Sequence, residues 1–187
     1  MRFKHLIIIF LSLSNSLLGQ HYDFVKIIPG QGIVYNNDTI LLYSTTIEDI
    51  YRIFKFKDPP DPLNPDKIKI SLWSGENDNG GIEFLRLIEF KSIIFKFFTE
   101  GVGYLLELSN IYIKEDNSFK AYTDNGLMIG MINPNINEIF PSFGKKDYIS
   151  ESGLSYQLFS HGISLKLEKI NDEDLKIIEI EVYRKIE

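Results

Sequence analysis

The residues with the clearest potential for metal chemistry form an acidic turn rich in asparagine: Glu76, Asn77, Asp78, Asn79 and Gly80. A calcium loop of the EF-hand kind needs oxygen-bearing side chains at its first, third and fifth positions, glycine at the sixth and glutamate at the twelfth. With Gly80 at the sixth position, the first is Gly75, which has no side chain, and the twelfth is Arg86. We therefore predict a solvated turn and no metal site.

Histidine offers little support for catalysis. After residue 20 the chain has two histidines, His21 and His161, and a zinc site or a Ser-His-Asp system would depend on His161 alone. His161 lies in the stretch of residues 159–162, which we interpret as an exposed turn. The paired glycines near residues 30 and 102 continue into neither a dinucleotide fingerprint nor a P-loop. The sequence therefore predicts no cofactor.

Paired carboxylates can hydrolyse glycosidic bonds, and Glu179 and Glu181 are such a pair. The alternation of apolar and charged residues around them predicts that both lie on one face of a strand, the face toward solvent. Catalytic carboxylates need different surroundings to separate their pKa values, and two solvated neighbours lack this difference. We predict no catalytic residue and a protein that is not an enzyme.

The single tryptophan, Trp73, comes shortly before the acidic turn. Tryptophan and tyrosine carry much of the binding energy of protein interfaces. The pattern predicts a protein-binding site with these members: Trp73, Glu76, Asn77, Asp78, Asn79 and Tyr51. The alternative for Trp73 is a core position at the end of a strand.

The amino terminus has the layout of a secretory signal peptide. Arg2 and Lys4 precede a continuous apolar run at residues 6–11, and Gly19 supplies a small residue at a plausible cleavage point. An uncleaved membrane anchor or a buried first strand are the alternatives. We expect residues 1–20 to be removed and the protein to be periplasmic or extracellular.

Charge and composition limit the possible partners. The chain of 187 residues has a net charge of −6 and no cysteine, and loss of Arg2 and Lys4 would take the charge to −8. An acidic protein is repelled by phosphate backbones and anionic lipids, so we expect neither nucleic-acid binding nor a stable membrane anchor after cleavage. The absence of cysteine excludes disulfides, so the core alone must stabilise the fold.

The expected elements are mostly strands. The chain has 29 isoleucines and one alanine, Ala121, which favours strands over helices, although an AT-rich genome would produce a similar bias. We expect strands at residues 68–73, 82–98 (bent near Ile88), 104–114, 154–159, 163–168 and 175–183. Two short helices are expected. The first is capped by Ser44 or Thr45, and Thr45 with Glu48 fits a capping box; the second follows Asn133 and Pro134.

These elements predict an α+β fold built from two similar units. Each unit reads as a strand, a short capped helix and an antiparallel meander, and the pair could form a pseudo-symmetric sheet with both helices on one face. The apolar spacing is the same in the two helices, at Ile47, Ile50 and Phe54 and again at Ile136, Ile139 and Phe143. We place the units at residues 21–117 and 118–187. The alternative is that the pattern recurs by chance.

The pattern of a capped short helix and a small meander, given twice behind a signal peptide, resembles the outer-membrane lipoprotein BamE and the β-lactamase inhibitor proteins. The part that carries this resemblance is residues 126–144 with the strands after it. The first half, with Asn36, Asn37, Trp73 and Gly81, resembles uncharacterised bacterial immunity-like domains. The resemblance implies a protein that binds other proteins through its surface.

We therefore expect a secreted protein-binding module: an inhibitor, an immunity protein or an envelope accessory protein. Its acidic surface should meet a basic surface on the partner. The alternatives are a purely structural envelope protein and an enzyme of unrecognised type. The enzyme alternative predicts a deep pocket lined by convergent polar groups.

Overall fold

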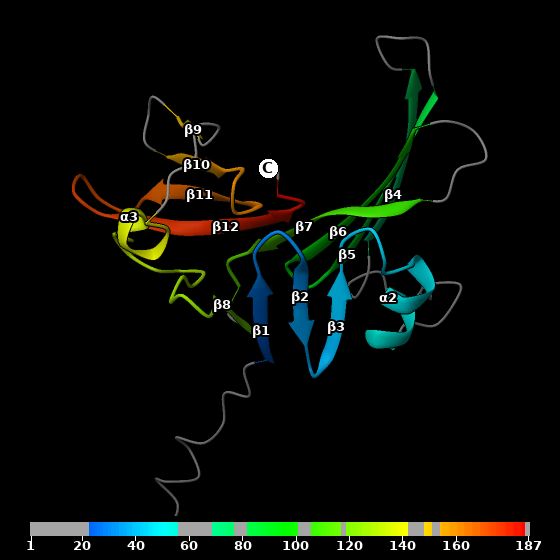
Figure 1. Cartoon of the computed structure of the whole chain (residues 1–187), viewed down its shortest axis with the longest axis horizontal. Helices are drawn as coiled ribbons and strands as arrows, with labels where there is room; N and C mark the ends of the chain where they lie inside the picture. Colours follow the sequence, from blue (N-terminus) through cyan, green and yellow to red (C-terminus); the bar gives the residue numbers. More distant parts are fainter. Residues whose placement is uncertain are drawn as a thin grey trace, which may run out of the picture.

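Two β-sheets make up most of the fold (Figure 1). A computed structural model describes residues 23–55, 69–76, 82–100, 106–116, 119–141, 148–150 and 154–185. The expected signal peptide lies outside these residues. The smaller sheet has the strand order β3-β2-β1-β8 and the larger has the order β4-β5-β6-β7-β12-β11-β10-β9.

The strands of the smaller sheet are β1 (Asp23–Ile28), β2 (Gly32–Tyr35), β3 (Asp38–Leu41) and β8 (Phe119–Thr123). The strands of the larger sheet are β4 (Lys69–Glu76), β5 (Ile82–Phe90), β6 (Ile93–Glu100), β7 (Glu107–Lys114), β9 (Tyr148–Ile149), β10 (Ser155–Leu158), β11 (Ile163–Lys169) and β12 (Leu175–Tyr183). Within the described part of the chain the helices are α2 (Ile47–Ile53) and α3 (Ile136–Ile139).

The predicted α+β class, with two helices covering one face of a pseudo-symmetric sheet, is wrong. The helices have seven and four residues, which is too short to cover an eight-stranded sheet. Strands from both expected units also share each sheet, because β1 pairs in parallel with β8 and β7 pairs with β12. The cover for the larger sheet is a second sheet, so the fold is mostly β.

The hydrophobic core lies between the two sheets. Strands of the smaller sheet contribute the fully buried Ile27 and Ile33, and strands of the larger sheet contribute Phe95, Ile111 and Ile180. Along β1 and β6 the buried positions recur at every second residue, which is the period-two pattern of sheets with one face on the core. Burying each such side chain stabilises the fold by about 1.5–3 kcal/mol, so the core can stabilise the chain without crosslinks.

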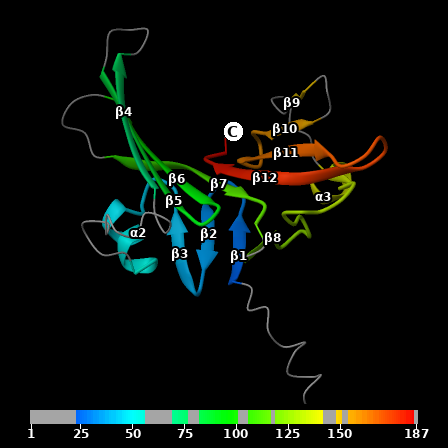
Figure 2. The ribbon, with the colours of Figure 1, turned by 180° about the vertical axis from the view of Figure 1, so that it is seen from behind.

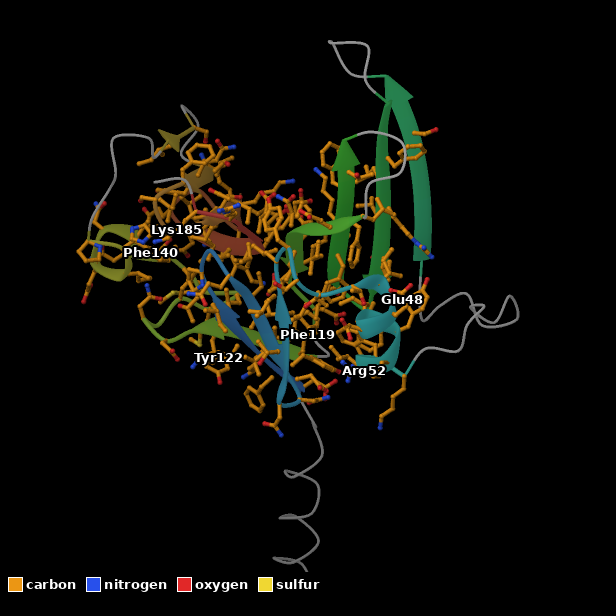
Figure 3. All side chains as sticks on the ribbon, turned by 45° about the vertical axis from the view of Figure 1, so that its right-hand side comes forward. Glu48, Arg52, Phe119, Tyr122, Phe140 and Lys185 are labelled. Carbon is orange, nitrogen blue, oxygen red and sulfur yellow. The ribbon has the colours of Figure 1, made fainter. Side chains whose placement is uncertain are left out.

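Buried and more exposed positions also alternate along β8, of which Figure 3 labels Phe119 and Tyr122. Phe119 is 1% exposed and packs in the core, whereas Tyr122 is half-buried. On the neighbouring strand β1, Phe24 pairs with Lys120 and remains 58% exposed. One face of the smaller sheet therefore supplies core residues and the other faces outward.

The sequence-based prediction missed β1 and β2, whereas β3 corresponds to the strand expected before the first helix. The turn between β2 and β3 consists of Asn36 and Asn37, whose φ angles are +48° and +71°. Two residues with positive φ form the turn type that matches the twist of a β-hairpin, and asparagine tolerates this conformation best after glycine. The two asparagines therefore close a hairpin, β2–β3.

The run predicted as one bent strand over residues 82–98 is two strands joined by a tight turn. Phe90 pairs with Ile93, so Lys91 and Ser92 form a two-residue loop, with Lys91 at φ +53°. Ile88 sits within β5 and pairs with Phe95. The prediction of a bend near Ile88 was wrong because Lys91 and Ser92 carry none of the glycine or asparagine signals of a hairpin turn.

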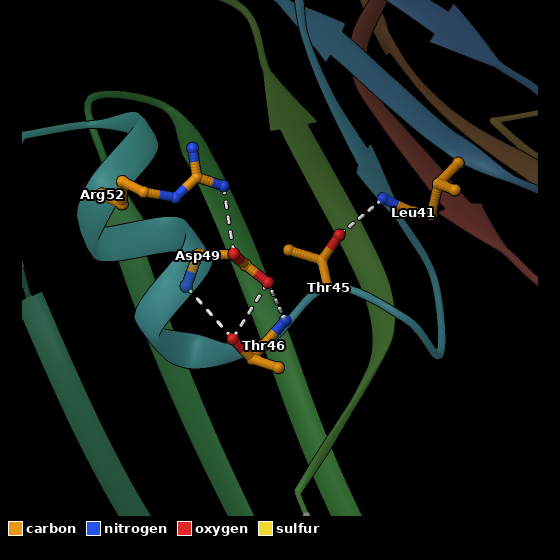
Figure 4. A network of polar contacts seen from close by, with 5 residues as sticks. All are labelled: Leu41, Thr45, Thr46, Asp49 and Arg52. Atoms are coloured by element: carbon orange, nitrogen blue, oxygen red, sulfur yellow. Dashed lines mark hydrogen bonds and ion pairs between the residues drawn. The ribbon is translucent and has the colours of Figure 1, made fainter.

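Helix α2 begins one residue later than predicted (Figure 4). Its N-cap is Thr46, whose Oγ1 accepts a hydrogen bond from the backbone N–H of Asp49 at 3.1 Å, while the Asp49 carboxylate accepts from the backbone N–H of Thr46 at 3.1 Å. Thr45, the predicted cap, instead accepts from the backbone N–H of Leu41 at 2.8 Å. Asp49 also pairs with Arg52 at 3.0 Å. The capping box is therefore Thr46 and Asp49, not Thr45 and Glu48.

The apolar face of α2 is the one predicted. Ile50 is fully buried and Phe54, the C-cap, is 8% exposed. The ring of Phe54 lies 4.8 Å from the ring of Tyr35 and 4.5 Å from that of Phe90. This aromatic cluster joins the helix to both sheets.

Helix α3 also begins later than predicted. Its N-cap is Asn135, which makes no side-chain cap, whereas Asn133 turns away at φ +48°. The Asn133 amide donates to Asp174 at 2.6 Å and its carbonyl oxygen accepts from the backbone N–H of Leu175 at 2.8 Å. Asn133 therefore ties this segment to the start of β12 instead of capping the helix. Phe143, expected on the apolar face, lies outside the described residues.

Candidate functional site

Most of the predicted binding site lies beyond what the structure describes. Asn77, Asp78 and Asn79 lie outside the described residues, and of Trp73 and Glu76 only the backbone is described: Trp73 pairs with Leu85 across the β4–β5 hairpin. The binding role of this hairpin therefore stays a prediction.

Tyr51, the remaining predicted member, has a partner on the larger sheet. Its hydroxyl accepts a hydrogen bond from Nη2 of Arg86 on β5 at 2.7 Å, and the Arg86 guanidinium lies 5.9 Å from the centre of its ring. Arg86 pairs with Leu72, the neighbour of Trp73, across the hairpin. Tyr51 is half-buried in this contact, so its first role is to join α2 to the larger sheet.

His161 lies in the turn between β10 and β11, as predicted, but it is half-buried and not exposed. Its ring is 4.9 Å from the ring of Phe140, which is buried at the end of α3. Within the described ranges no group of three or more His, Cys, Asp or Glu side chains is placed to hold a metal ion. No helix in the described part of the chain is long and apolar enough to cross a membrane.

An open cleft of about 910 Å³ lies where the ends of the two sheets meet. The larger sheet is bent, with β4–β6 rising on one side of β7 and β12, and β9 and β10 rising on the other (Figures 1 and 2). The residues that line the cleft come from several segments: Gly30, Tyr43, Ser109, Asn110, Gln157, Phe159, Ser164, Glu181, Tyr183, Arg184 and Lys185.

Two glycines hold the segments around the cleft together. Gly30, in the turn after β1, donates its backbone N–H to the carbonyl of Gly162 at 3.2 Å, and the same carbonyl accepts from the backbone N–H of Tyr183 at 3.0 Å. Gly162 has a φ of +68°, and a β-carbon there would clash with the Gly30 backbone. The close approach of the two turns therefore requires glycine at residue 162.

A single carboxylate, that of Glu181 on β12, is held by side chains from the strands on either side. Asn110 donates to its Oε1 at 2.7 Å and Ser164 donates to its Oε2 at 3.0 Å. Tyr112 faces Glu181 across the β7–β12 pair. The two hydrogen bonds fix the position of the carboxylate, since they come from β7 and β11.

Tyr112 is half-buried beside Glu181. Burial raises the pKa of Tyr112 well above its usual range, and the negative charges of Glu181 and Glu179 raise it further. Tyr112 is therefore neutral at any physiological pH. The prediction that Glu179 and Glu181 share a face is confirmed, but both are half-buried and not on an open solvent face.

No ion pair joins Glu181 to a cation among the described residues. The ion pairs in the described part of the chain join Lys26 to Asp124, Arg52 to Asp49, Lys91 to Asp23 and Lys176 to Glu115. The two side chains that donate to Glu181, Asn110 and Ser164, are both neutral. Dipoles, and no ion pair, therefore hold the carboxylate among the described residues.

Aromatic rings and two cations, Arg184 and Lys185, form the rim of the cleft. The Tyr43 ring, 45% exposed, lies 5.7 Å from the guanidinium carbon of Arg184. On the other side the rings of Phe159 and Tyr183 are 5.8 Å apart, and the Tyr183 hydroxyl donates to the carbonyl of Ile163 at 3.0 Å. The rim therefore offers flat apolar surfaces next to Arg184 and Lys185.

Comparison with known proteins gave no match to a family model, to a curated protein or to a solved structure. Nothing in these comparisons bears on the resemblance to BamE and the β-lactamase inhibitor proteins. The function must therefore be argued from the cleft itself.

The cleft was missed at the level of sequence because its residues are far apart in the chain. Asn110 and Glu181 are 71 positions apart, and only the pairing of β7 with β12 brings them together. The alternation in each strand could have placed Asn110 with Tyr112, or Glu179 with Glu181, on one face. The strand order that joins the two faces was not available from periodicity.

Proposed function

We propose that this chain is an exported, non-enzymatic protein that binds another protein, and that the cleft around Glu181 is its contact site. The observation that carries the proposal is the half-buried carboxylate of Glu181, which two neutral donors, Asn110 and Ser164, hold without an ion pair among the described residues. Such a group gains most from a positively charged partner, because a buried charge with an opposite charge in contact is better stabilised than one without.

The charge of the whole chain supports the same partner. The net charge of −6, which becomes −8 if the signal peptide is removed, attracts a basic protein over distances of about a Debye length, roughly 8 Å at physiological salt. This attraction raises the rate of association more than the affinity. The association rate with a basic partner should therefore fall as salt is added.

The cleft also bears on the enzyme alternative, which predicted a deep pocket with convergent polar groups. Polar side chains do converge on Glu181, so the enzyme alternative cannot be dismissed by a lack of polar groups in the cleft. However, the lining contains one carboxylate, two cations and no histidine. The two-carboxylate mechanism considered for Glu179 and Glu181 has only one of its members in the lining, which favours binding over hydrolysis.

A peptide selection tests the proposal. A random-peptide library displayed on phage would be selected against the purified protein, and the recovered peptides would be measured against two variants. Gln157→Trp places a large ring in the cleft from an exposed position on β10, and Thr39→Trp makes the same kind of change on exposed β3, away from the cleft. Both replace a neutral polar side chain on a strand.

We expect the peptides to bind wild type and Thr39→Trp alike, and to bind Gln157→Trp at least about tenfold more weakly, a change of about 1.4 kcal/mol. Peptides that bind Gln157→Trp as tightly as wild type would place the contact site elsewhere.

A further inference from the structure

Tyr43, at the rim of the cleft, has a strained backbone. Its φ angle is +60°, in the left-handed region that is unfavourable for a bulky side chain. Its backbone N–H donates to the carbonyl of Leu108 at 2.9 Å, which ties the segment after β3 to β7. Glycine would adopt this conformation without strain. Unfavourable backbone conformations of this kind cluster at functional sites, where the rest of the fold offsets their cost.

The ring of Tyr43 gains little from burial. It remains 45% exposed and lines the cleft, whereas the core rings of this protein are almost completely buried. The ring contact that the structure shows is with Arg184, whose guanidinium carbon lies over the ring at 5.7 Å from its centre. The contribution that offsets the strain at Tyr43 therefore involves Arg184.

Arg184 keeps its capacity for hydrogen bonds. A guanidinium carries several N–H donors in one plane, and attraction to the face of a ring occupies none of them. Arg184 is exposed at the cleft, and among the described residues it joins no ion pair and donates no hydrogen bond. The ring therefore limits where the guanidinium lies while its donors stay open to a ligand.

The charges of the lining favour an anion at this point. The lining has two cations, Arg184 and Lys185, against one carboxylate, Glu181. The Glu181 carboxylate already accepts from Asn110 and Ser164. A carboxylate is a good partner for a guanidinium, because two parallel N–H···O hydrogen bonds match the geometry of both groups.

We infer that Arg184, positioned by the ring of Tyr43, binds an acidic side chain of the partner protein. This inference rests on the proposed function and adds a second group to the contact: an acid at the rim beside the basic group that meets Glu181. A mixed contact of this kind rejects surfaces of a single sign, since like charges placed opposite each other cost free energy. The long-range charge of the chain attracts a basic partner, and Arg184 specifies how that partner is oriented.

A small glutamate derivative tests the carboxylate site without a known partner. The purified, isotope-labelled protein would be titrated with N-acetyl-glutamate methylamide at constant ionic strength, while the Nε–H signal of Arg184 is followed by NMR. The matched probe is N-acetyl-glutamine methylamide, which has the same length and no charge. We expect the glutamate derivative to bind at least about threefold more tightly than the glutamine derivative. Equal binding of the two, or an Arg184 signal that does not move, would overturn the inference.

Charge variants locate the site. Arg184→Gln should remove the preference for the glutamate derivative. Lys169→Gln, which removes the same charge from an exposed position on β11 outside the cleft lining, should leave the preference intact. An unchanged preference in Arg184→Gln would place the carboxylate elsewhere and refute the assignment.

The positioning role of Tyr43 is tested by removing and by keeping its ring. Tyr43→Gly should lower the preference by at least about twofold, and Tyr43→Phe, which keeps the ring, should retain it. Lys55→Gly is the control, because Lys55 is exposed, has a φ of +55° and lies outside the cleft lining. A cooperative urea transition checks that both glycine variants fold. Equal preferences in wild type and Tyr43→Gly would contradict the role of the ring.

Two further variants separate Arg184 from Glu181. Glu181→Gln removes a negative charge from the lining, so it should not weaken binding of the glutamate derivative. Glu168→Gln, which changes an exposed carboxylate on β11 outside the lining, should bind the derivative as wild type does. Weaker binding in Glu181→Gln than in Glu168→Gln would contradict the assignment to Arg184.

Peptides selected on the cleft, with amidated carboxyl termini, extend the test to a protein partner. Each aspartate or glutamate of a peptide would be replaced by its amide. We expect one such replacement to weaken binding to wild type by at least about threefold and to leave binding to Arg184→Gln unchanged.

The outcomes distinguish this inference from the proposed function. If the peptides require the cleft but tolerate the loss of every acidic side chain, protein binding stands and the inference fails. If the glutamate derivative binds at Arg184 but no selected peptide depends on the cleft, the carboxylate site stands and protein recognition fails.

Discussion

Gly30 and Gly162 meet backbone to backbone at the edge of the cleft, so that the first turn of the smaller sheet rests on a turn of the larger one. The Gly162 carbonyl accepts from Gly30 at 3.2 Å, and a β-carbon on Gly162 would clash with the Gly30 backbone and the Tyr183 carbonyl. On Gly30 itself a β-carbon would lie 3.1 Å from the His161 carbonyl oxygen. This contact fixes the distance between the walls of the cleft.

Gly162→Ala should therefore destabilise the protein by more than backbone strain alone explains. An alanine at positive φ costs about 1–2 kcal/mol, and forcing the two turns apart adds about 1–3 kcal/mol. Gly126→Ala is the matched control, since Gly126 has a φ of +92° but no atom within 4 Å of its would-be β-carbon. Urea unfolding measures the free energy of unfolding of both variants. Equal losses of stability in Gly162→Ala and Gly126→Ala would show that the contact between the turns is unimportant.

Phe95 should be one of the most sensitive core positions. It is fully buried on β6, and its ring lies 5.4 Å from that of Phe54. Phe95→Ala should cost about 3–5 kcal/mol through lost transfer energy and a residual cavity. Phe24→Ala, at a position 58% exposed, should change stability by no more than about 0.5 kcal/mol. Thermal and urea unfolding measure the stability of both variants. A smaller loss of stability in Phe95→Ala than in Phe24→Ala would contradict this packing.

The capping box of α2 predicts different effects for two neighbouring acids. Hydrogen bonds from the Thr46 backbone, Arg52 and the Thr46 hydroxyl lower the pKa of Asp49. Its contribution to stability is therefore complete above the unfolded pKa of about 4 and is lost as pH falls through the lower folded value. Asp49→Asn should destabilise the protein at pH 7, and the difference from wild type should shrink below pH 4.

Glu48→Gln is the control for the capping box, because it removes the same charge from the first turn of the helix without breaking the cap. Thr46→Ala should cost about 1 kcal/mol. If Glu48→Gln destabilises the protein as much as Asp49→Asn at pH 7, the helix would begin at the predicted Thr45 and not at Thr46.

The environment of Tyr35 predicts how the stability of the fold changes at alkaline pH. Burial raises the pKa of Tyr35 to about 12, with a further contribution from its hydrogen bond to Asp23, which measures 2.9 Å. A raised folded pKa means that stability is complete below the unfolded pKa of about 10 and declines as pH rises through the folded value. Tyr35→Phe should lose less stability between pH 9 and 12 than wild type. An identical decline in both proteins would contradict the shift.

The strands with strict alternation could be predicted from sequence. The expected strand at residues 175–183 matches β12, and the one at residues 163–168 ends one residue before β11. Their apolar residues face the core because the period is two. The two helices were also placed to within a few residues, since their apolar spacing is clear even where the capping residue was wrong.

The parts that failed depend on contacts between distant residues. The parallel pair of β1 with β8 places Val25 opposite Ala121, and no local sequence pattern predicts such a pair. The choice between Thr45 and Thr46 as cap depends on the hydrogen bond that Thr45 makes with Leu41. The cleft was missed for the same reason, because the position of the Glu181 side chain depends on Asn110 of β7 and Ser164 of β11.

The central claim is that the carboxylate of Glu181, which neutral donors hold in the cleft, carries recognition. Calorimetric titration of a peptide selected on the cleft into wild type, Glu181→Gln and Glu168→Gln tests it most directly. The structure predicts that Glu181→Gln binds the peptide at least about tenfold more weakly than wild type, while Glu168→Gln binds it as wild type does. Equal affinities for wild type and Glu181→Gln would contradict the claim.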